Sequence, residues 1–153
     1  MRSVDSDFGF ARWEDAAGEP VDFPSRPSVE WLQRHQWQWQ GGKLDELLHA
    51  SRNRSLAVCG AAYNMADHLG KFDLLILLRI DESTMIRRLT DPSRNNDWGK
   101  VGATLDWSRE LRRRQEAALT GAEPVDARQP LGSVVDDVLR IIRAHGIDLS
   151  PAD

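Results

Sequence analysis

The segment at residues 72–80 constrains the fold most, because it is almost continuously apolar. Residues 74–78 are all Leu or Ile, without the polar alternation of a strand that has one face in water. Such runs are typical of strands covered on both faces, as in a parallel sheet. A shorter apolar run at residues 55–60 ends in Gly60 and indicates another strand of this kind. A last short strand is predicted at residues 124–127.

Segments with helical spacing of apolar residues alternate with these strands. Leucines mark a helix at residues 43–49, and Asp81 stands where it would cap a following helix. Residues 104–119 are predicted to form a helix with one strongly basic face. Residues 131–145 predict a helix that stops before Gly146. This alternation indicates the α/β class, with a three-layer parallel sheet flanked by helices.

Residues 8–42 depart from that pattern. They combine several prolines and glycines with aromatic side chains, and prolines interrupt regular structure. We therefore expect an irregular substrate-side segment or short helices rather than a sheet. Trp31, Trp37 and Trp39 are expected to pack together. At 153 residues the chain is expected to form a single domain.

The composition excludes several classes of partner. A net charge of −4 argues against general nucleic-acid binding. The sequence has no apolar stretch of about 18 residues, and its first residues lack the apolar core of a secretory signal. The single Cys59 has no internal disulfide partner, which suits a reducing compartment. The four histidines show no metal-site spacing, so no metal cluster is predicted. We expect a cytoplasmic protein with neither membrane nor nucleic-acid partners.

The sequence contains no P-loop for binding phosphate. That loop requires Gly-x-x-x-x-Gly-Lys-Ser/Thr between a strand and a helix, since consecutive backbone N–H groups surround the phosphate oxygens. Gly-Lys pairs occur at residues 42–43, 70–71 and 99–100. They are followed by Leu, Phe and Val rather than by the hydroxyl residue that binds magnesium.

Polar residues follow two of the predicted strands. Asp5 and Asp7 lie where a short first strand would end, and ligands of open α/β sheets bind at the carboxyl ends of strands. They are candidate substrate or magnesium contacts, or else parts of a solvated turn or cap. Asn64 follows the strand at residues 55–60 and is a candidate substrate contact. The alternative is a strand that ends in glycine, followed by a capping Asn.

A group of cations follows the apolar run at residues 72–80. Arg87 and Arg88 lie on the predicted helix, while Arg94 and Lys100 lie on a polar, lid-like loop at residues 91–102. Phosphoryl transfer is helped by cations that a closing loop brings to the equatorial oxygens. We take Arg94 and Lys100 as candidate catalytic residues. Arg87 and Arg88 either bind phosphate or form the solvated face of their helix.

Four segments, in chain order, resemble the shikimate-kinase and adenylate-kinase-like group of P-loop kinases. Residues 4–7, Val-Asp-Ser-Asp, resemble the end of its second strand with acidic substrate-site residues. Residues 56–64 are similar to its third strand and the following turn. Residues 72–100, ending in Asn-Asn-Asp-Trp-Gly-Lys, resemble its fourth strand, an Arg-bearing helix and the lid. Residues 125–139 resemble its last strand, adenine-side loop and C-terminal helix.

The resemblance implies ATP and Mg²⁺ as cofactors and an unidentified small molecule as phosphate acceptor. Asp5 and Asp7 would face substrate or magnesium, and Arg94 the phosphates. Arg128 and Pro130 would lie beside the adenine. The chain departs from the group by lacking the first strand, the P-loop and the first helix. Together these need about 25–30 residues, the size of a βα half-unit.

In the group, the first strand lies in the middle of the sheet, so its loss would leave a gap with exposed strand edges. The sequence therefore predicts an ATP-dependent small-molecule kinase-like domain, truncated at its N-terminus and weakly active or inactive as this chain. The alternative is a non-catalytic interaction module derived from the same fold. In that case a partner chain or another copy of the chain would cover the open sheet edge.

Overall fold

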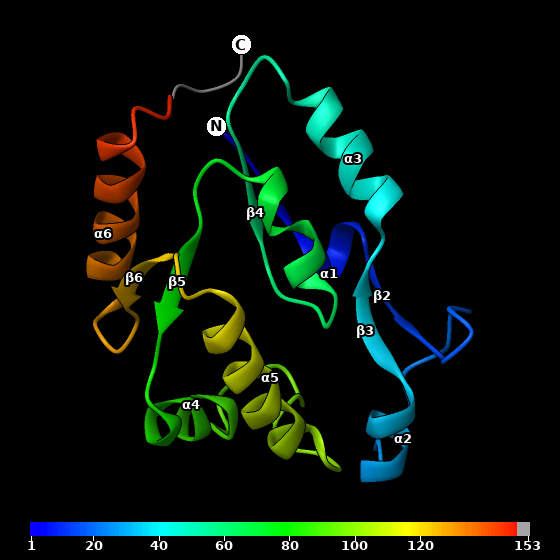
Figure 1. The fold of residues 1–153 in the computed structure, drawn as a ribbon. Helices are drawn as coiled ribbons and strands as arrows, with labels where there is room; N and C mark the ends of the chain where they lie inside the picture. Colours follow the sequence, from blue (N-terminus) through cyan, green and yellow to red (C-terminus); the bar gives the residue numbers. More distant parts are fainter. Residues whose placement is uncertain (150–153) are drawn as a thin grey trace.

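The computed structural model describes residues 1–149. The α/β class predicted from the sequence is confirmed, because short parallel and antiparallel strand pairs occur together with helices (Figure 1). The elements, in chain order, are β1 (Arg2–Asp5), α1 (Ser6–Gly9), β2 (Ala11–Glu14), α2 (Val29–Arg34), β3 (Gln36–Trp39), α3 (Gly41–Ala50), β4 (Leu56–Cys59), the 3₁₀ helix η1 (Met65–Lys71), β5 (Ile76–Arg79), α4 (Glu82–Leu89), α5 (Thr104–Ala118), β6 (Glu123–Asp126) and α6 (Leu131–Ala144).

The strands form three separate pairs rather than one continuous sheet. β1 and β4 are parallel, with Val4 opposite Val58, and β5 and β6 are parallel, with Leu78 opposite Val125. β2 and β3 are antiparallel. Within residues 1–149, no ladder joins one pair to another. A three-layer kinase-like sheet therefore stays a prediction.

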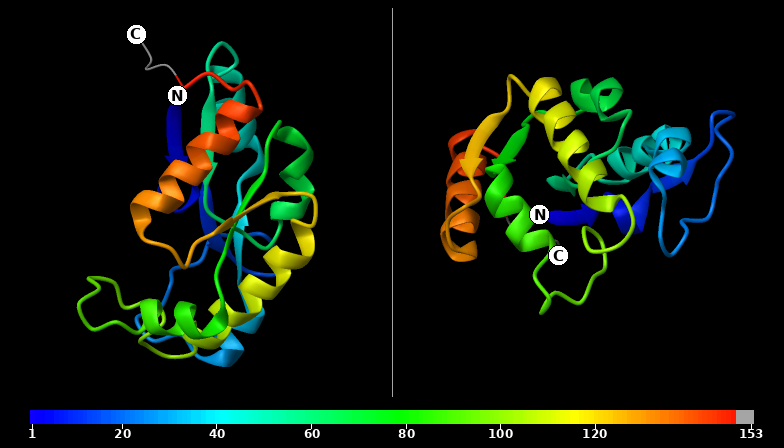
Figure 2. Two further views of the ribbon diagram at one scale, coloured as in Figure 1. Left: turned by 90° about the vertical axis from the view of Figure 1, so that its left-hand side faces the viewer. Right: turned by 90° about the horizontal axis from the view of Figure 1, so that it is seen from below.

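The two parallel pairs lie beside each other with their strands pointing the same way (Figure 1). Both figures place β4 on the side of its pair that faces β5 (Figures 1 and 2). α5 lies over one face of these pairs and α6 lies on the opposite face, against β5 and β6 (Figure 2). The carboxyl ends of the four parallel strands thus share one side of the molecule.

The strand in the apolar run at residues 72–80 is shorter and more exposed than predicted. β5 covers only Ile76–Arg79, and none of its side chains is fully buried. Leu78 is 51% exposed. β6 pairs with one edge of β5, and no strand among the described residues pairs with the other edge. The prediction of a buried strand is therefore wrong for Leu78 and Arg79, and the other side chains of β5 are only partly buried.

Residues 8–42 contain a strand pair that the sequence analysis did not predict. β2 and β3 place Trp13 opposite Trp37, with the ring centroids 5.6 Å apart. The Gln-Trp-Gln-Trp alternation of β3 is the strand signal, and the prolines lie in the connection after β2. The expectation of an irregular segment is wrong for β2 and β3.

Trp13 is the centre of a group of aromatic rings that joins β2 and β3 to α5 and the loop at residues 91–102. Its ring centroid lies 5.1 Å from that of Trp31, 5.6 Å from that of Trp107 and 6.3 Å from that of Trp98. The expected packing of Trp31, Trp37 and Trp39 is thus confirmed only in part, because Trp31 and Trp37 each pack against Trp13, whereas Trp39 packs against Phe10. The aromatic cluster consists of Trp13, Phe23, Trp31, Trp37, Trp98 and Trp107.

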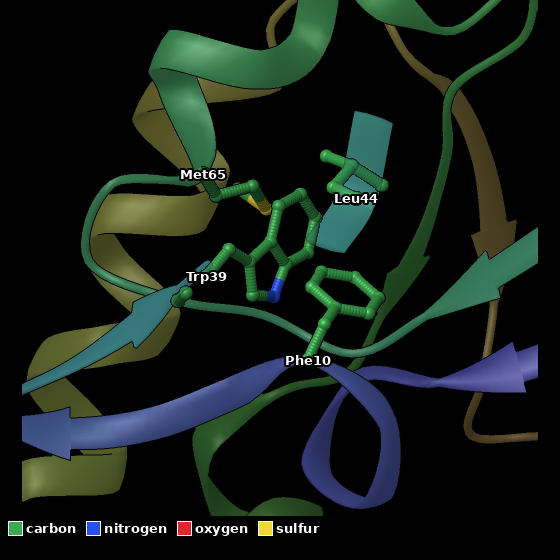
Figure 3. Close-up of a cluster of buried hydrophobic side chains, with 5 residues drawn as sticks. Phe10, Trp39, Leu44 and Met65 are labelled. Atoms are coloured by element: carbon green, nitrogen blue, oxygen red, sulfur yellow. The ribbon is translucent and has the colours of Figure 1, made fainter. Parts of the chain in front are cut away.

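Two further groups of buried apolar residues lie under the two parallel pairs. The N-terminal core has Leu44 and Phe10 at its centre, which are 0% and 1% exposed, and Trp39 packs edge-on against Phe10 (Figure 3). The C-terminal core lies between β5, β6 and α6 and includes Val125 and Val134. The two cores share no residue, so each parallel pair is stabilised by its own apolar cluster.

The predicted helix ends are confirmed. The Asp81 carboxylate caps α4 by accepting the N–H of Thr84 at 2.8 Å. α6 ends at Ala144, and Gly146 adopts a φ of 69°, the left-handed conformation that glycine favours.

The strongly basic face predicted for α5 is wrong, because carboxylates neutralise it. Glu110 accepts from both Arg113 and Arg114, at 2.8 and 2.9 Å. Arg109 pairs with Asp106 and with Glu82 of α4. α5 therefore presents ion pairs to solvent.

Candidate functional site

A polar cavity of about 550 Å³ lies at the carboxyl ends of β5 and β6. This is the usual position of a ligand in an open α/β sheet. β5 and β6 supply one wall, and α5 supplies the facing wall. The charged lining consists of Arg79, Asp81, Arg112, Glu116, Asp126 and Arg128. We call this feature the polar cavity.

Arg128 and Asp126 form a two-pronged ion pair at its rim. Nε and Nη2 of Arg128 donate to the two carboxylate oxygens of Asp126, both at 2.8 Å, and the Arg128 N–H donates at 3.0 Å. The Arg128 side chain, and then its N–H, lower the pKa of Asp126 to about 2. Asp126 is therefore ionised at neutral pH, and a ligand anion must compete with it for Arg128.

Asp81 forms the next part of the lining. Its carboxylate accepts the Ser83 hydroxyl at 2.6 Å and the Thr84 N–H at 2.8 Å. These bonds lower the pKa of Asp81 to about 2, and the positive charge of Arg128 contributes a smaller effect. The capping role of Asp81 thus places a permanent negative charge beside the cavity.

Arg112 crosses the cavity from α5. It donates to Glu116 at 2.9 Å and to the Ile80 carbonyl at 3.3 Å, and Glu82 lies 3.9 Å away. Its Nε is buried and has no hydrogen-bond partner among residues 1–149. Arg112 therefore ties the end of β5 to α5 and keeps one unused donor.

The Arg79 side chain, by contrast, is exposed and makes no hydrogen bond or ion pair with another described residue. The three arginines of the cavity face three carboxylates, so its charges nearly balance. An anionic group bound here would use Arg79 first, because Arg112 and Arg128 already have carboxylate partners.

Asp5 and Asp7 lie at the end of β1 and are bonded within their own short turn. Asp5 accepts the Asp7 N–H at 2.9 Å and so caps α1. The Ser6 hydroxyl donates to Asp7 at 3.3 Å. Partial burial, followed by the negative charge of Asp5, raises the pKa of Asp7. Among residues 1–149, no cluster of three or more acidic, His or Cys side chains is arranged to hold a metal ion.

The cations of the lid-like loop bond to the loop itself. Nη1 of Arg94 donates to the carbonyls of Leu89 and Trp98, at 3.2 and 2.7 Å. Nζ of Lys100 donates to the Arg94 carbonyl. Both positive charges thus stabilise the loop conformation in this structure.

The loop is also held against α5. Nε1 of Trp98 donates to Ser108 at 2.8 Å, and the N–H of Gly99 donates to Thr104 at 2.9 Å. A Cβ at Gly99 would lie 2.7 Å from the Cβ of Leu89, and its φ is 85°. The loop is therefore packed down in this structure, with Trp98 in the aromatic cluster.

Of the candidate nucleotide-binding residues on α4 and at the start of α6, one side chain is bonded within the fold and two are exposed. Arg88 donates to the carbonyls of Ala127 and Arg128, at 2.7 and 3.4 Å, and so ties α4 to the loop after β6. The Arg87 side chain is exposed and contacts no described residue through a hydrogen bond or ion pair. Pro130 is exposed at the N-terminus of α6.

The Asn64 side chain is fully used within the fold. Its oxygen accepts the Trp39 N–H and its nitrogen donates to the Trp39 carbonyl, both at 2.9 Å. Asn64 therefore joins the end of β3 to the start of η1, a structural role that sequence reasoning did not foresee.

The structure brings together only part of the predicted site. Arg88 and Arg128 are in contact, whereas Asp5 with Asp7, and Arg94 with Lys100, form separate groups.

Sequence reasoning missed Arg79 and Asp126 as cavity residues. A charged residue at the carboxyl end of each predicted strand indicates these positions, by the same reasoning that makes Asp5 a candidate.

Comparison of the chain with protein-family models, with curated proteins and with solved structures gave no match. Residues 1–149 contain no helix with the length and apolar character needed to cross a membrane.

Proposed function

We propose that this chain is a kinase-like α/β domain of the ATP-dependent small-molecule phosphotransferase type, with weak or no catalysis in its present form. The observation that carries the proposal is the polar cavity, which lies at the carboxyl ends of parallel strands and contains the Arg79 side chain, which has no partner among residues 1–149. The nucleotide would enter beside Arg79, Arg128 and Pro130. Substrate would lie toward Asp5 and Asp7, at the end of β1 on the same side of the molecule.

The residues present fit the nucleoside end of ATP better than its triphosphate. The loop after β6 supplies Arg128 and Pro130, but the sequence has no P-loop to supply a row of N–H donors. Arg94 and Lys100 donate to backbone carbonyls rather than toward the cavity. Asp5 and Asp7 provide two carboxylates for Mg²⁺, fewer than a site made by protein alone requires. Weak nucleotide binding and very slow transfer are the expected consequence.

Thermal unfolding with and without millimolar Mg-ATP tests this proposal. We expect ATP to raise Tm by about 2–4 °C, the effect of roughly 1 kcal/mol of binding free energy. Arg79→Gln should abolish the rise. Arg140→Gln is the matched control, because Arg140 is an exposed arginine on α6 outside the cavity. A rise that survives Arg79→Gln would contradict the site, and phosphoryl transfer at ordinary kinase rates would contradict the proposed lack of efficient catalysis.

A second candidate function is a non-catalytic interaction module. The observation that favours it is the free edge of both β4 and β5 within the described residues. Unpaired strand edges readily pair with another chain. Size-exclusion chromatography distinguishes the two functions, because a defined oligomer indifferent to nucleotide favours the interaction module.

A further inference from the structure

We infer that the space between β4 and β5 is a docking site for one extended, apolar strand of a partner chain, which pairs with both strands at once. This inference deepens the second proposed function and does not depend on nucleotide binding. It rests on the backbone groups at the two edges, on the side chains beside them and on the contrast with the outer edges.

The backbone groups that face the space are identified by the ladders on the other side. The Leu75 carbonyl accepts from Glu123 at 2.9 Å and the Arg79 carbonyl accepts from Ala127 at 2.8 Å. Since successive residues of a strand direct their N–H and C=O to opposite edges, Ile76 and Leu78 direct theirs away from β6.

The same reasoning applies to β4. The Ser55 carbonyl accepts the Arg2 N–H at 3.0 Å, so Leu56 and Val58 direct their backbone groups away from β1. No backbone hydrogen bond from another described residue reaches these inward-facing groups of β4 and β5. Two rows of donors and acceptors therefore face away from β1 and β6, and the inferred strand would pair with both rows.

The outer edges of the two pairs differ from these inner edges. The outward-facing positions of β6 are Pro124 and Asp126, and proline has no N–H to donate. The outward-facing positions of β1 are Ser3 and Asp5. Charges and proline are the usual means of blocking strand addition. The inner edges have neither, because their positions are Leu56, Val58, Ile76 and Leu78.

The side chains around the space define the chemistry of the incoming strand. Val4 and Val58 belong to the N-terminal core, and Ile76 belongs to the C-terminal core. Leu78 and Val135 remain 51% and 45% exposed on the α6 side. A strand of β-branched residues would cover these side chains and connect the two cores, whereas a charged strand would bury unpaired charge.

An isolated strand fits this space better than a second copy of the chain. α5 lies over one face of the parallel pairs (Figure 2). Each strand of this chain is already paired, so a second copy would have to release one of its own strands. A partner that presents an unpaired apolar segment can dock without first breaking strand pairs of its own.

The test uses a fluorescent peptide with five alternating Val and Ile residues between lysine pairs, added to the full chain. Binding is followed by fluorescence anisotropy and by hydrogen exchange. We expect saturable binding and at least tenfold slower exchange of the Leu56, Val58, Ile76 and Leu78 N–H groups. The same peptide with an N-methyl group on each of the five central residues should not bind, because it keeps the side chains but loses the donors of both edges.

Leu78→Lys is the matching protein variant, since Leu78 is half exposed and a lysine is tolerated in the free chain. It should weaken peptide binding at least tenfold, while Phe8→Lys, at a residue that is 93% exposed on α1, should not. The Arg79→Gln variant should bind the peptide normally. A failure of the nucleotide-binding proposal can therefore be distinguished from a failure of the docking-site inference.

Absence of binding overturns the inference, and so does equal binding of the N-methyl peptide. Slower exchange confined to β1 or β6 would also overturn it, since the peptide would then occupy an outer edge. A concentration-dependent dimer that the peptide dissociates would assign the space to a second copy and contradict the proposed partner strand.

Discussion

The two parallel strand pairs have the same local geometry but different surroundings. The β1–β4 pair has a core that includes fully buried Phe10 and Leu44, and its connections carry four of the six rings of the aromatic cluster. The β5–β6 pair relies on α6 and a smaller core, and it leaves Leu78 and Val135 half exposed. The larger buried core and the polar cavity therefore lie in different parts of the molecule. The predictions below test that separation.

Leu44→Ala should have the largest effect. Leu44 is 0% exposed in the N-terminal core, and a cavity at such a position costs about 3–4 kcal/mol of unfolding free energy. Chemical denaturation followed by Trp fluorescence measures the loss. A loss below about 1 kcal/mol would contradict the central place of this core.

Val134→Ala should have a smaller effect that is confined to the other half. Val134 is 8% exposed in the C-terminal core, and removal of two methyl groups there costs about 1–2 kcal/mol. Because the cores share no residue, the double variant with Leu44→Ala should be additive within about 0.5 kcal/mol. A larger coupling energy would show that the two halves form one core.

Asp81→Ala should destabilise the half of the molecule that contains β5 and β6, because it removes the cap of α4. Loss of such a cap lowers Tm by about 3 °C for a chain of this size. Asp81 has a pKa of about 2 in the folded chain, below its unfolded value, so its contribution is present at neutral pH and is lost as the pH falls toward 2. Thermal scans at several pH values should show the variant and the parent chain converging in acid.

Asp7→Asn should have the smallest effect and the opposite sign. The pKa of Asp7 is raised in the folded chain, so its ionised form destabilises the fold above that pKa. The variant should have a slightly higher Tm at pH 7, and the gain should vanish below the unfolded pKa of about 4. Carboxyl NMR titration gives the pKa directly, and a value below that of an unfolded Asp would contradict the prediction.

Local patterns predicted most elements of the fold. The cap at Asp81, the helical spacing of α3 and α6 and the left-handed Gly146 are determined by neighbouring residues, and each is confirmed. The partial exposure of β5 was not predictable, because the apolar run at residues 72–80 is typical of a buried strand and does not reveal how far the helices cover Leu78.

The candidate site was less predictable for a related reason. Hydrogen-bond partners decide whether a charge is available, and the partners of Arg94 and Asn64 are backbone groups that carry no sequence signal. Arg79 is available because it lacks such a partner among the described residues. The sequence predicted which charged residues follow the strands. It did not predict which of those side chains have hydrogen-bond partners in the fold.

Hydrogen exchange of the unliganded chain is the most direct test of the central claim that the two parallel pairs are not joined between β4 and β5. Alternate residues of the same strand provide the internal control. The account predicts slow exchange at Ala57 and Leu77, whose N–H groups face the paired edges, and fast exchange at Val58 and Ile76, whose N–H groups face the space. Slow exchange at all four positions would contradict it, because both inner edges would then be paired.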